Sequence, residues 1–427
     1  MGPFDAWRRQ ELQISSERSR CEDANRRALA TRPAKPLEPL PPFSPSGSMM
    51  LTPAAALKRL MTVSLPALGH GYMAFVARWS WVPYLWAFAS PASGKPLRLS
   101  TPAAQLAGRR KALLSEQLGI AIGLSVMERH LKLGARDAFV VPIDADVAIA
   151  AAKAGRFAFG QRSKRGSRPD YFVIKWVPGE PVEVHSLECK GKSTPPGAPE
   201  LASAARQLHG VGVGWAGGFQ PPPGVVVASS MNERVILAEA FDPEGDEIWV
   251  GPPAEPDREA VPSVQKSGEE DLVIDLPRFR RLLIDIHEAT LLEIGGGPGD
   301  GGAEEVRFFE TPLGAFRGAA YTVPLSPGLE AEAFLGVERG IYEALAGSRL
   351  DSAAEARAVW AATFRERSSA GQRDPAAQQD ALPEWDLVEV DEERMTSYTL
   401  DENGVMLHLQ IRPRSSRSWV SRSSSRR

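Results

Sequence analysis

A run of apolar segments and turns between residues 138 and 230 constrains the fold more than any other stretch of the chain. Residues 171–177 are rich in β-branched and aromatic side chains, which is typical of a strand. The turn sequence Pro-Gly-Glu-Pro at 178–181 separates them from a second strand at 182–189. Two strands joined by so short a turn predict an antiparallel hairpin.

The segments around this hairpin predict further helices and strands. A helix is expected from about 103 to 133, because its apolar residues keep near-helical spacing. A strand at 138–149, running into a short helical turn, precedes the hairpin. After the hairpin, a polar loop leads to a helix at about 200–209 and to a buried strand at 225–228. This order predicts an α/β fold in which helices flank a sheet.

Three side chains of the hairpin suit a catalytic site. Asp170 lies at the start of the first strand, and Glu188 and Lys190 lie near the end of the second. Alternate residues of a strand share a face, so Glu188 and Lys190 point the same way and Cys189 points to the opposite side. Antiparallel pairing brings Asp170 toward Glu188. A surface ion pair would stabilise the fold by at most ~1 kcal/mol, and it leaves the place of these residues beside an apolar strand unexplained.

Two neighbouring carboxylates point to a bound metal ion. They repel one another, and one of them would gain a raised pKa. A divalent cation removes the repulsion, and Mg²⁺ or Mn²⁺ accepts carboxylate oxygens together with water and phosphate oxygens. Such a cation polarises a phosphate and lowers the pKa of a bound water, while a lysine beside it offsets developing charge. The residues therefore favour metal-dependent phosphodiester hydrolysis.

The sequences Arg-Pro-Asp at 168–170 and Leu-Glu-Cys-Lys-Gly-Lys at 187–192 resemble the motif of the PD-(D/E)XK nuclease superfamily. The resemblance covers about residues 105–235 and implies a restriction-endonuclease-like core, a mixed sheet flanked by helices. It further implies that Asp170 and Glu188 hold the metal and that the backbone carbonyl of Cys189 adds a ligand. Lys190 would then assist the attacking water.

The same resemblance implies two further site residues. Members of the superfamily often place another acid on the helix before the first core strand, where Glu116 is our first candidate and Glu128 the second. Many also carry a glutamine on the helix after the lysine, and Gln207 fits that position. The tyrosine that sometimes follows four residues later is replaced here by Val211, a departure from the pattern of that subfamily.

Nucleic acid binding needs local basic charge, because the formal net charge of the chain is −3. Basic residues surround the motif, and we expect them to contact phosphates, although a solvated loop explains any single one of them. The residues chosen as nucleic-acid-binding candidates are Arg162, Lys164, Arg165, Arg168 and Lys192. A Ser/Arg tail at 412–427 either adds affinity or serves as a disordered end.

The length of 427 residues predicts two or three domains. Composition divides the chain into five parts: a disordered Pro-rich head at 1–48, an aromatic-rich subdomain at 49–104, the nuclease core at 105–235, an α+β accessory domain at 236–411 and the basic tail at 412–427. The head contributes no visible core, so Met49 or Met50 is an alternative start. The second part holds an aromatic cluster that offers either a stacking platform for bases or a small core, and we favour the core. The cluster consists of Trp79, Trp81, Tyr84, Trp86 and Phe88.

The C-terminal region gives weaker signals. Its spacing predicts helices at 277–292, 329–346 and 352–367, and a hairpin at 398–411 around the turn at 401–404. The chain has two cysteines, Cys21 and Cys189, which excludes a zinc site of several cysteines and fits a reducing cytoplasm. Charged residues and prolines interrupt the most apolar stretch before it reaches the ~20 residues that a membrane-spanning helix needs.

Together these features predict a cytoplasmic Mg²⁺- or Mn²⁺-dependent nuclease that acts on DNA, preferably double-stranded. The resemblance suggests restriction or antiphage defence as its role, with a defence-system protein as partner. Cutting both strands often calls for two active sites, which favours a homodimer. The alternatives are a non-catalytic nucleic-acid-binding or scaffold module of a larger complex, and an RNA-directed or structure-selective nuclease with the same catalytic residues.

Overall fold

The computed structural model describes most of the chain. The described residues are 5–7, 9–29, 36–41, 43–64, 84–90, 96–133, 135, 138–159, 168–177, 180–215, 218–243, 272–296, 306–311, 314–326, 328–347, 350–371, 385–390 and 395–413. Three candidate nucleic-acid contacts, Arg162, Lys164 and Arg165, lie outside them. So do Trp79 and Trp81 and residues 414–427 of the predicted tail.

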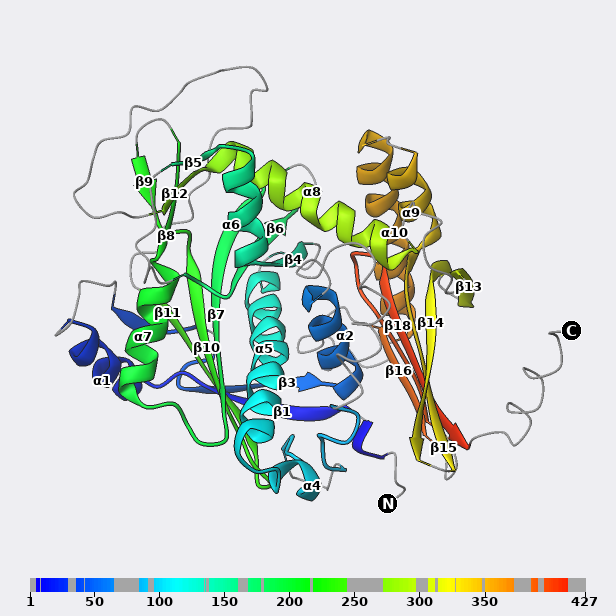
Figure 1. Ribbon diagram of the computed structural model, residues 1–427, viewed down its shortest axis with the longest axis horizontal. Coiled ribbons are helices and arrows are strands. Elements are labelled where there is room, and N and C mark those ends of the chain that lie inside the picture. Colours follow the sequence, from blue (N-terminus) through cyan, green and yellow to red (C-terminus); the bar gives the residue numbers. More distant parts are fainter. Residues whose placement is uncertain are drawn as a thin grey trace, which may run out of the picture.

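An eight-stranded mixed sheet forms the centre of the molecule (Figure 1). Its main path runs β3-β1-β11-β10-β7-β6-β4, and β2 pairs with β11 off this path. The strands are β1 (Gln10–Ser15), β2 (Leu37–Pro39), β3 (Ser46–Leu51), β4 (Phe139–Asp144), β6 (Tyr171–Trp176), β7 (Glu183–Lys192), β10 (Gly224–Met231) and β11 (Ile236–Pro243). The pairs β7/β10 and β1/β11 are parallel, and the other neighbours are antiparallel.

Helices cover both faces of this sheet. On one face, α5 (Gly108–Lys132) packs on β7 and β10 in a core that includes Val225 and Val227. On the other, α7 (Ala198–Leu208) and α1 (Arg18–Leu29) pack on Val226 and Ala228. Successive side chains of a strand point to opposite faces, and helices cover both faces of β10. This strand is therefore buried along its whole length. The expected α/β class, the β6–β7 hairpin and the helices that flank it are therefore confirmed.

The N-terminal head is structured, so the prediction of a disordered segment at 1–48 is wrong for the described part. Strand β1 lies between β3 and β11, and its Leu12 and Ile14 are fully buried. The alternation of these two apolar residues was too short a signal to outweigh the polar and proline-rich surroundings. The predicted boundary at 235 also falls inside the sheet, because β11 continues it past that residue.

A second sheet of four strands adjoins the first. It has the order β5-β12-β8-β9, from β5 (Ala158–Phe159), β8 (Val211–Trp215), β9 (Gly218–Gln220) and β12 (Leu272–Asp275). Helices α6 (Ala145–Ala154) and α8 (Leu276–Ile294) pack with it in one core. The predicted strand at 138–149 is wrong beyond Asp144, whose side chain accepts hydrogen bonds from the backbone of the next turn and caps α6.

A third, antiparallel sheet occupies the C-terminal region. Its order is β13-β14-β15-β18-β17-β16, from β13 (Val306–Thr311), β14 (Gly314–Ser326), β15 (Leu329–Glu338), β16 (Trp385–Val390), β17 (Met395–Leu400) and β18 (Val405–Pro413). Helices α9 (Arg339–Ala346) and α10 (Leu350–Gly371) accompany it. The hairpin predicted at 398–411 is confirmed as β17 and β18, and the helix predicted at 352–367 as part of α10.

The helix predicted at 329–346 is wrong over its first half. Residues 329–338 form β15, in which Ala331 and all of residues 333–337 are buried. Alanine, glutamate and leucine favour helices, but pairing with β14 and β18 on either side overrides that local preference.

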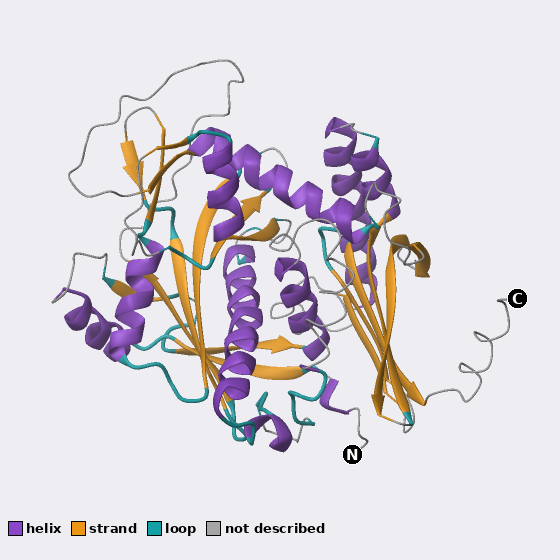
Figure 2. Cartoon of the chain, viewed as in Figure 1, coloured by secondary structure: helices purple, strands orange, loops and turns teal. Residues whose placement is uncertain are grey.

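Helix α2 (Pro53–Ser64) lies between α5 and the C-terminal sheet (Figure 2). The 3-10 turn η1 (Asp5–Trp7) and the short helix α4 (Thr101–Ala104) lie at the same end of the molecule (Figure 1). Tyr84 and Phe88 of the aromatic-rich part are buried, whereas Trp86 is 44% exposed. None of the described helices is long and apolar enough to cross a membrane.

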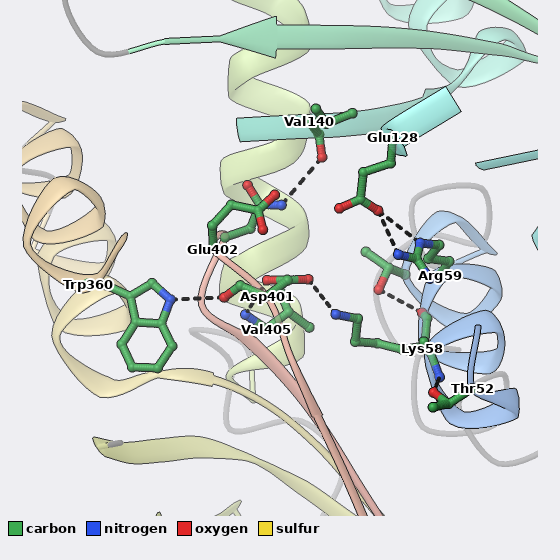
Figure 3. Close-up of polar contacts among 12 residues, drawn as sticks. Thr52, Lys58, Arg59, Glu128, Val140, Trp360, Asp401, Glu402 and Val405 are labelled. Atoms are coloured by element: carbon green, nitrogen blue, oxygen red, sulfur yellow. Dashed lines mark hydrogen bonds and ion pairs between the residues drawn. The ribbon is translucent and has the colours of Figure 1, made fainter. Parts of the chain in front are cut away.

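Buried charges join α2, α5 and the β17–β18 turn (Figure 3). The Lys58 ammonium lies 2.9 Å from Asp401, the Arg59 guanidinium lies 2.8 Å from Glu128, and the Lys132 ammonium lies 2.5 Å from Glu402. Lys132 also contacts Glu128 at 2.5 Å. Charges buried this deeply are stable only when they are paired, so the network holds the C-terminal sheet in a defined position against α5.

Candidate active site at the carboxyl end of β7

A cleft of about 950 Å³ opens at the carboxyl end of β7. Its walls come from the first half of α5, the β4–α6 junction, the start of β6 and the end of β7. The charged and polar residues that line it include Lys111, Ser115, Glu116, Gln117, Asp144, Asp146, Arg168, Asp170, Lys190, Lys192 and Ser193. Acidic and basic side chains thus gather around the predicted motif.

Asp170 is held at the end of β7 by its backbone and by its side chain. Its N–H donates to Leu187 O at 3.1 Å, and its own carbonyl accepts from Ala145 N at 3.0 Å. Its carboxylate Oδ2 accepts from the Cys189 N–H at 2.8 Å. The hairpin therefore brings Asp170 to the Glu-x-Lys sequence, as its antiparallel pairing predicts.

Glu188 is a buried carboxylate beside this group. Its side chain has no solvent exposure, and its Oε1 accepts from the Lys190 ammonium. Its Oε2 is buried and has no hydrogen-bond partner among the described residues. Burial, and then the charge of Asp170, raise the pKa of Glu188 to about 8. Burial is also the main reason why the pKa of Asp170 is raised.

Lys190 is oriented from two sides. Its ammonium contacts Glu188 and donates to Gln207 Oε1 at 2.9 Å. The Gln207 amide in turn donates to the Arg168 carbonyl at 3.5 Å. Burial opposes the charge on Lys190, but the Glu188 carboxylate outweighs it, and the pKa of Lys190 is raised. The structure thus brings Gln207 to the predicted lysine, from a helix that follows it in the chain.

The side chain of Cys189 points to the other face of β7, as its position in the strand predicts. It lies against α5, and a Cβ on Gly123 would come within 2.4 Å of its sulfur. One turn earlier, a Cβ on Gly119 would lie 2.6 Å from Gly191 Cα. The absence of side chains at Gly119 and Gly191 lets α5 approach the end of β7 closely, which places the first half of the helix on the cleft.

The close packing of α5 on β7 places the two candidates for a further acid in different surroundings. Glu116 is exposed and lines the cleft, and its charge contributes to the raised pKa of Asp170. Glu128 lies three turns further along α5 and pairs with Arg59 and Lys132 outside the cleft. Burial opposes the charge of Glu128, but these two cations hold its pKa well below the usual range. The structure therefore favours Glu116.

Two of the predicted nucleic-acid contacts lie on the cleft. Arg168 forms an ion pair with Asp146, and Lys192 forms one with Glu200. The Lys192 side chain is 42% exposed and the Arg168 side chain is 39% exposed. Exposed ion pairs of this kind contribute little to stability and are readily exchanged for contacts with a phosphate.

The cleft also contains residues that were not predicted from the sequence, among them Lys111, Ser115, Asp144 and Asp146. Asp144 Oδ1 accepts from the N–H groups of Asp146 and Val147, at 2.8 and 3.1 Å. Asp144 and Asp146 follow an apolar run, and acidic residues in that place are a signal for a helix cap at the end of a strand. Both residues were predicted to lie inside a longer strand, so their position at the cleft was missed.

The donor set fits a divalent metal ion with few protein ligands. Among the described residues, no three histidine, cysteine, aspartate or glutamate side chains gather closely enough to hold a metal by themselves. Mg²⁺, however, usually takes one or two carboxylates and completes its shell with water and phosphate oxygens. Asp170 and Glu188 supply two carboxylates, and the unpartnered Oε2 of Glu188 is an atom that a cation would satisfy.

Comparisons with family models, with curated proteins and with solved structures found no match for this chain. The resemblance to the PD-(D/E)XK superfamily therefore rests on the motif residues alone.

Proposed function

We propose that this protein is a metal-dependent nuclease of the PD-(D/E)XK type that hydrolyses phosphodiester bonds in DNA. The observation that carries the proposal is the convergence of Asp170, Glu188 and Lys190 at the end of β7, beside an open cleft. The buried, unpartnered Oε2 of Glu188 adds a reason for a cation at this place.

Asp170 and Glu188 would hold Mg²⁺ or Mn²⁺, with the Cys189 carbonyl as a further ligand that the family pattern suggests. When bound, the ion would polarise the phosphate and lower the pKa of a water molecule. The Cys189 N–H orients the Asp170 carboxylate through its bond to Oδ2. Because the raised pKa of Glu188 favours its protonated form, a metal held by this carboxylate would displace its proton and would bind more tightly as the pH rises toward 8.

Lys190 supplies positive charge where the attacking water and the phosphate meet. Its raised pKa keeps the ammonium charged at neutral pH, so it offsets negative charge that develops on the phosphate. Gln207 holds the ammonium through its Oε1 and acts as a positioning residue. Glu116 lines the same cleft and would be the further acid that the family pattern suggests.

The test is incubation of the purified protein with plasmid, linear and single-stranded DNA and with RNA, in Mg²⁺ or Mn²⁺, beside the variant Lys190→Ala. We expect cleavage of double-stranded DNA that stops with EDTA and falls at least a hundredfold in the variant. Lys175→Ala is the matched control, because Lys175 pairs with Glu183 at the other end of the same hairpin. Cleavage that is indifferent to Lys190, or equal loss in both variants, would contradict the proposal.

A non-catalytic nucleic-acid-binding or scaffold module of a larger complex is the second candidate. The direct contact of Lys190 with Glu188 favours it, because the ammonium already compensates the carboxylate that a metal would use. DNA binding without cleavage in any metal would select this candidate. Preferential cleavage of RNA or of branched DNA would instead identify an RNA-directed or structure-selective nuclease with the same residues.

The partners follow from the same proposal. Each chain supplies one set of Asp170, Glu188 and Lys190, so cutting both strands favours a homodimer on the DNA. Light scattering with and without duplex DNA tests this. A role in restriction or antiphage defence, with a defence-system partner protein in the cytoplasm, is the biological setting that we propose; plaque counts on cells carrying wild type or Lys190→Ala test it.

A further inference from the structure

An ion pair between Arg168 and Asp146 lies on the cleft, close to the catalytic group. Arg168 comes two residues before Asp170 in the chain, and Asp146 lies in the first turn of α6. Both residues of the pair line the cleft, and the Asp146 side chain is 59% exposed. A pair as exposed as this contributes little to stability, so stability does not explain its place at the cleft.

The backbone that carries each partner of this pair is held in place. The N–H of the residue before Asp146 donates to the Asp170 carbonyl at 3.0 Å, which joins the two segments. The Gln207 amide donates to the Arg168 carbonyl at 3.5 Å. Because both backbones are fixed, the Asp146 carboxylate determines the direction in which the long Arg168 side chain extends.

We propose that Asp146 is a positioning residue that holds the Arg168 guanidinium for contact with a phosphate of the DNA backbone, next to the phosphate that is hydrolysed. The proposal rests on the nuclease function given above and names a substrate contact for it. Asp146 accepts from Nη2, at one end of the guanidinium. A guanidinium carries five N–H donors in a planar fork, so a phosphate can bind the remaining donors without displacing the acid.

The charge of Asp146 alone would have the opposite effect on DNA. A carboxylate in the cleft repels phosphates, so an acid that only added negative charge would weaken binding. An acid that orients Arg168 restricts this side chain before the DNA arrives, so less conformational entropy is lost when the phosphate binds. The two roles therefore predict changes of opposite sign when Asp146 is removed.

The test is a double-mutant cycle on DNA binding in EDTA, where metal-dependent cleavage does not run. Fluorescence anisotropy on a short labelled duplex measures Kd for the wild type, Asp146→Ala, Arg168→Ala and the double variant. We expect binding about tenfold weaker for Arg168→Ala and about threefold weaker for Asp146→Ala. In the Arg168→Ala background, removal of Asp146 should not weaken binding further.

The salt dependence of binding identifies a lost phosphate contact. Arg168→Ala should lower the slope of log K against log salt by about one, and Asp146→Ala should lower it in the same direction. Asp146→Asn keeps an oxygen that can accept from the guanidinium, so its affinity should lie between those of the wild type and Asp146→Ala.

Glu116→Gln is the control for charge. Glu116 lines the same cleft and forms no ion pair among the described residues, so its neutral variant should bind DNA at least as tightly as the wild type. Thermal denaturation of every variant checks the fold, and Asp146→Asn takes the place of Asp146→Ala in the cycle if the latter unfolds.

The outcomes separate this contact from the nuclease function, because cleavage by the wild type is measured on its own in Mg²⁺. Weaker binding by Asp146→Ala that requires Arg168 supports the proposal, whether or not the wild type cleaves. Equal or tighter binding by Asp146→Ala, or weakening that persists without Arg168, overturns it and leaves a cleaving wild type as a nuclease. Absence of DNA binding by the wild type overturns the proposal as well.

Discussion

Glu188→Gln is the variant that tests the electrostatics of the site most directly. The buried Glu188 carboxylate has a pKa raised from 4.5 to about 8, so the folded state binds its proton more tightly than the unfolded state does. Below pH 4.5, the pKa of Glu188 in the unfolded state, the carboxyl is protonated in both states and its burial removes no stability through ionisation. As the pH rises from there to the folded pKa, the unfolded state ionises and the folded state progressively loses stability.

The magnitude follows from the two pKa values. Between pH 5 and pH 8 the wild type should lose about 3 kcal/mol of unfolding free energy through this group alone. A glutamine does not ionise, so Glu188→Gln should lack this slope and be more stable than the wild type at pH 8. Urea denaturation of both proteins at the two pH values, without metal, measures the difference.

A control variant and a metal titration test whether the pH dependence comes from Glu188. Glu200, in the first turn of α7, has its pKa lowered, first of all by its hydrogen bond with Lys192, so its ionisation does not remove stability as the pH rises. Glu200→Gln should therefore run parallel to the wild type. Added Mg²⁺ should stabilise the wild type at pH 8 and not Glu188→Gln. Parallel stability profiles for the wild type and Glu188→Gln would refute the reasoning about the buried carboxylate.

Two further substitutions test contacts around the site. Gln207→Ala removes the acceptor that orients Lys190, and we expect kcat to fall about tenfold with little change in KM; an unchanged kcat in steady-state assays would show that Glu188 alone positions the ammonium. Glu128→Gln leaves the buried cations Arg59 and Lys132 with a neutral neighbour. It should lower the unfolding free energy, measured by urea denaturation, by about 3 kcal/mol. An unfolding free energy equal to that of the wild type would show that Glu402 is sufficient to stabilise the buried cations.

The local pattern of the chain was enough to predict the hairpin and its chemistry. The β-branched strands and the turn between them lie within one short stretch, so their pairing needs no distant information. The two-residue period then places Glu188 and Lys190 on one face, and the hairpin pairing brings Asp170 to them. Gln207 was predicted only through the resemblance to the nuclease superfamily, which implies a glutamine on the helix after the lysine.

Contacts between distant segments decided the rest. Strand β1 pairs in parallel with β11, more than two hundred residues away, and that pairing joins the head to the central sheet. Residues 329–338 became a strand because β14 and β18 flank them. The choice of Glu116 over Glu128 depended on where α5 crosses β7, at two glycines whose meeting no local pattern reveals.

The sequence by itself thus determined the identity and the order of the catalytic candidates, because strand periodicity and tight turns act over a few residues. Only the tertiary structure decided the shape of the cleft and the burial that raises the pKa of Glu188. Burial and close packing depend on which segments meet across the whole fold, and that choice is settled by the sum of many long-range contacts.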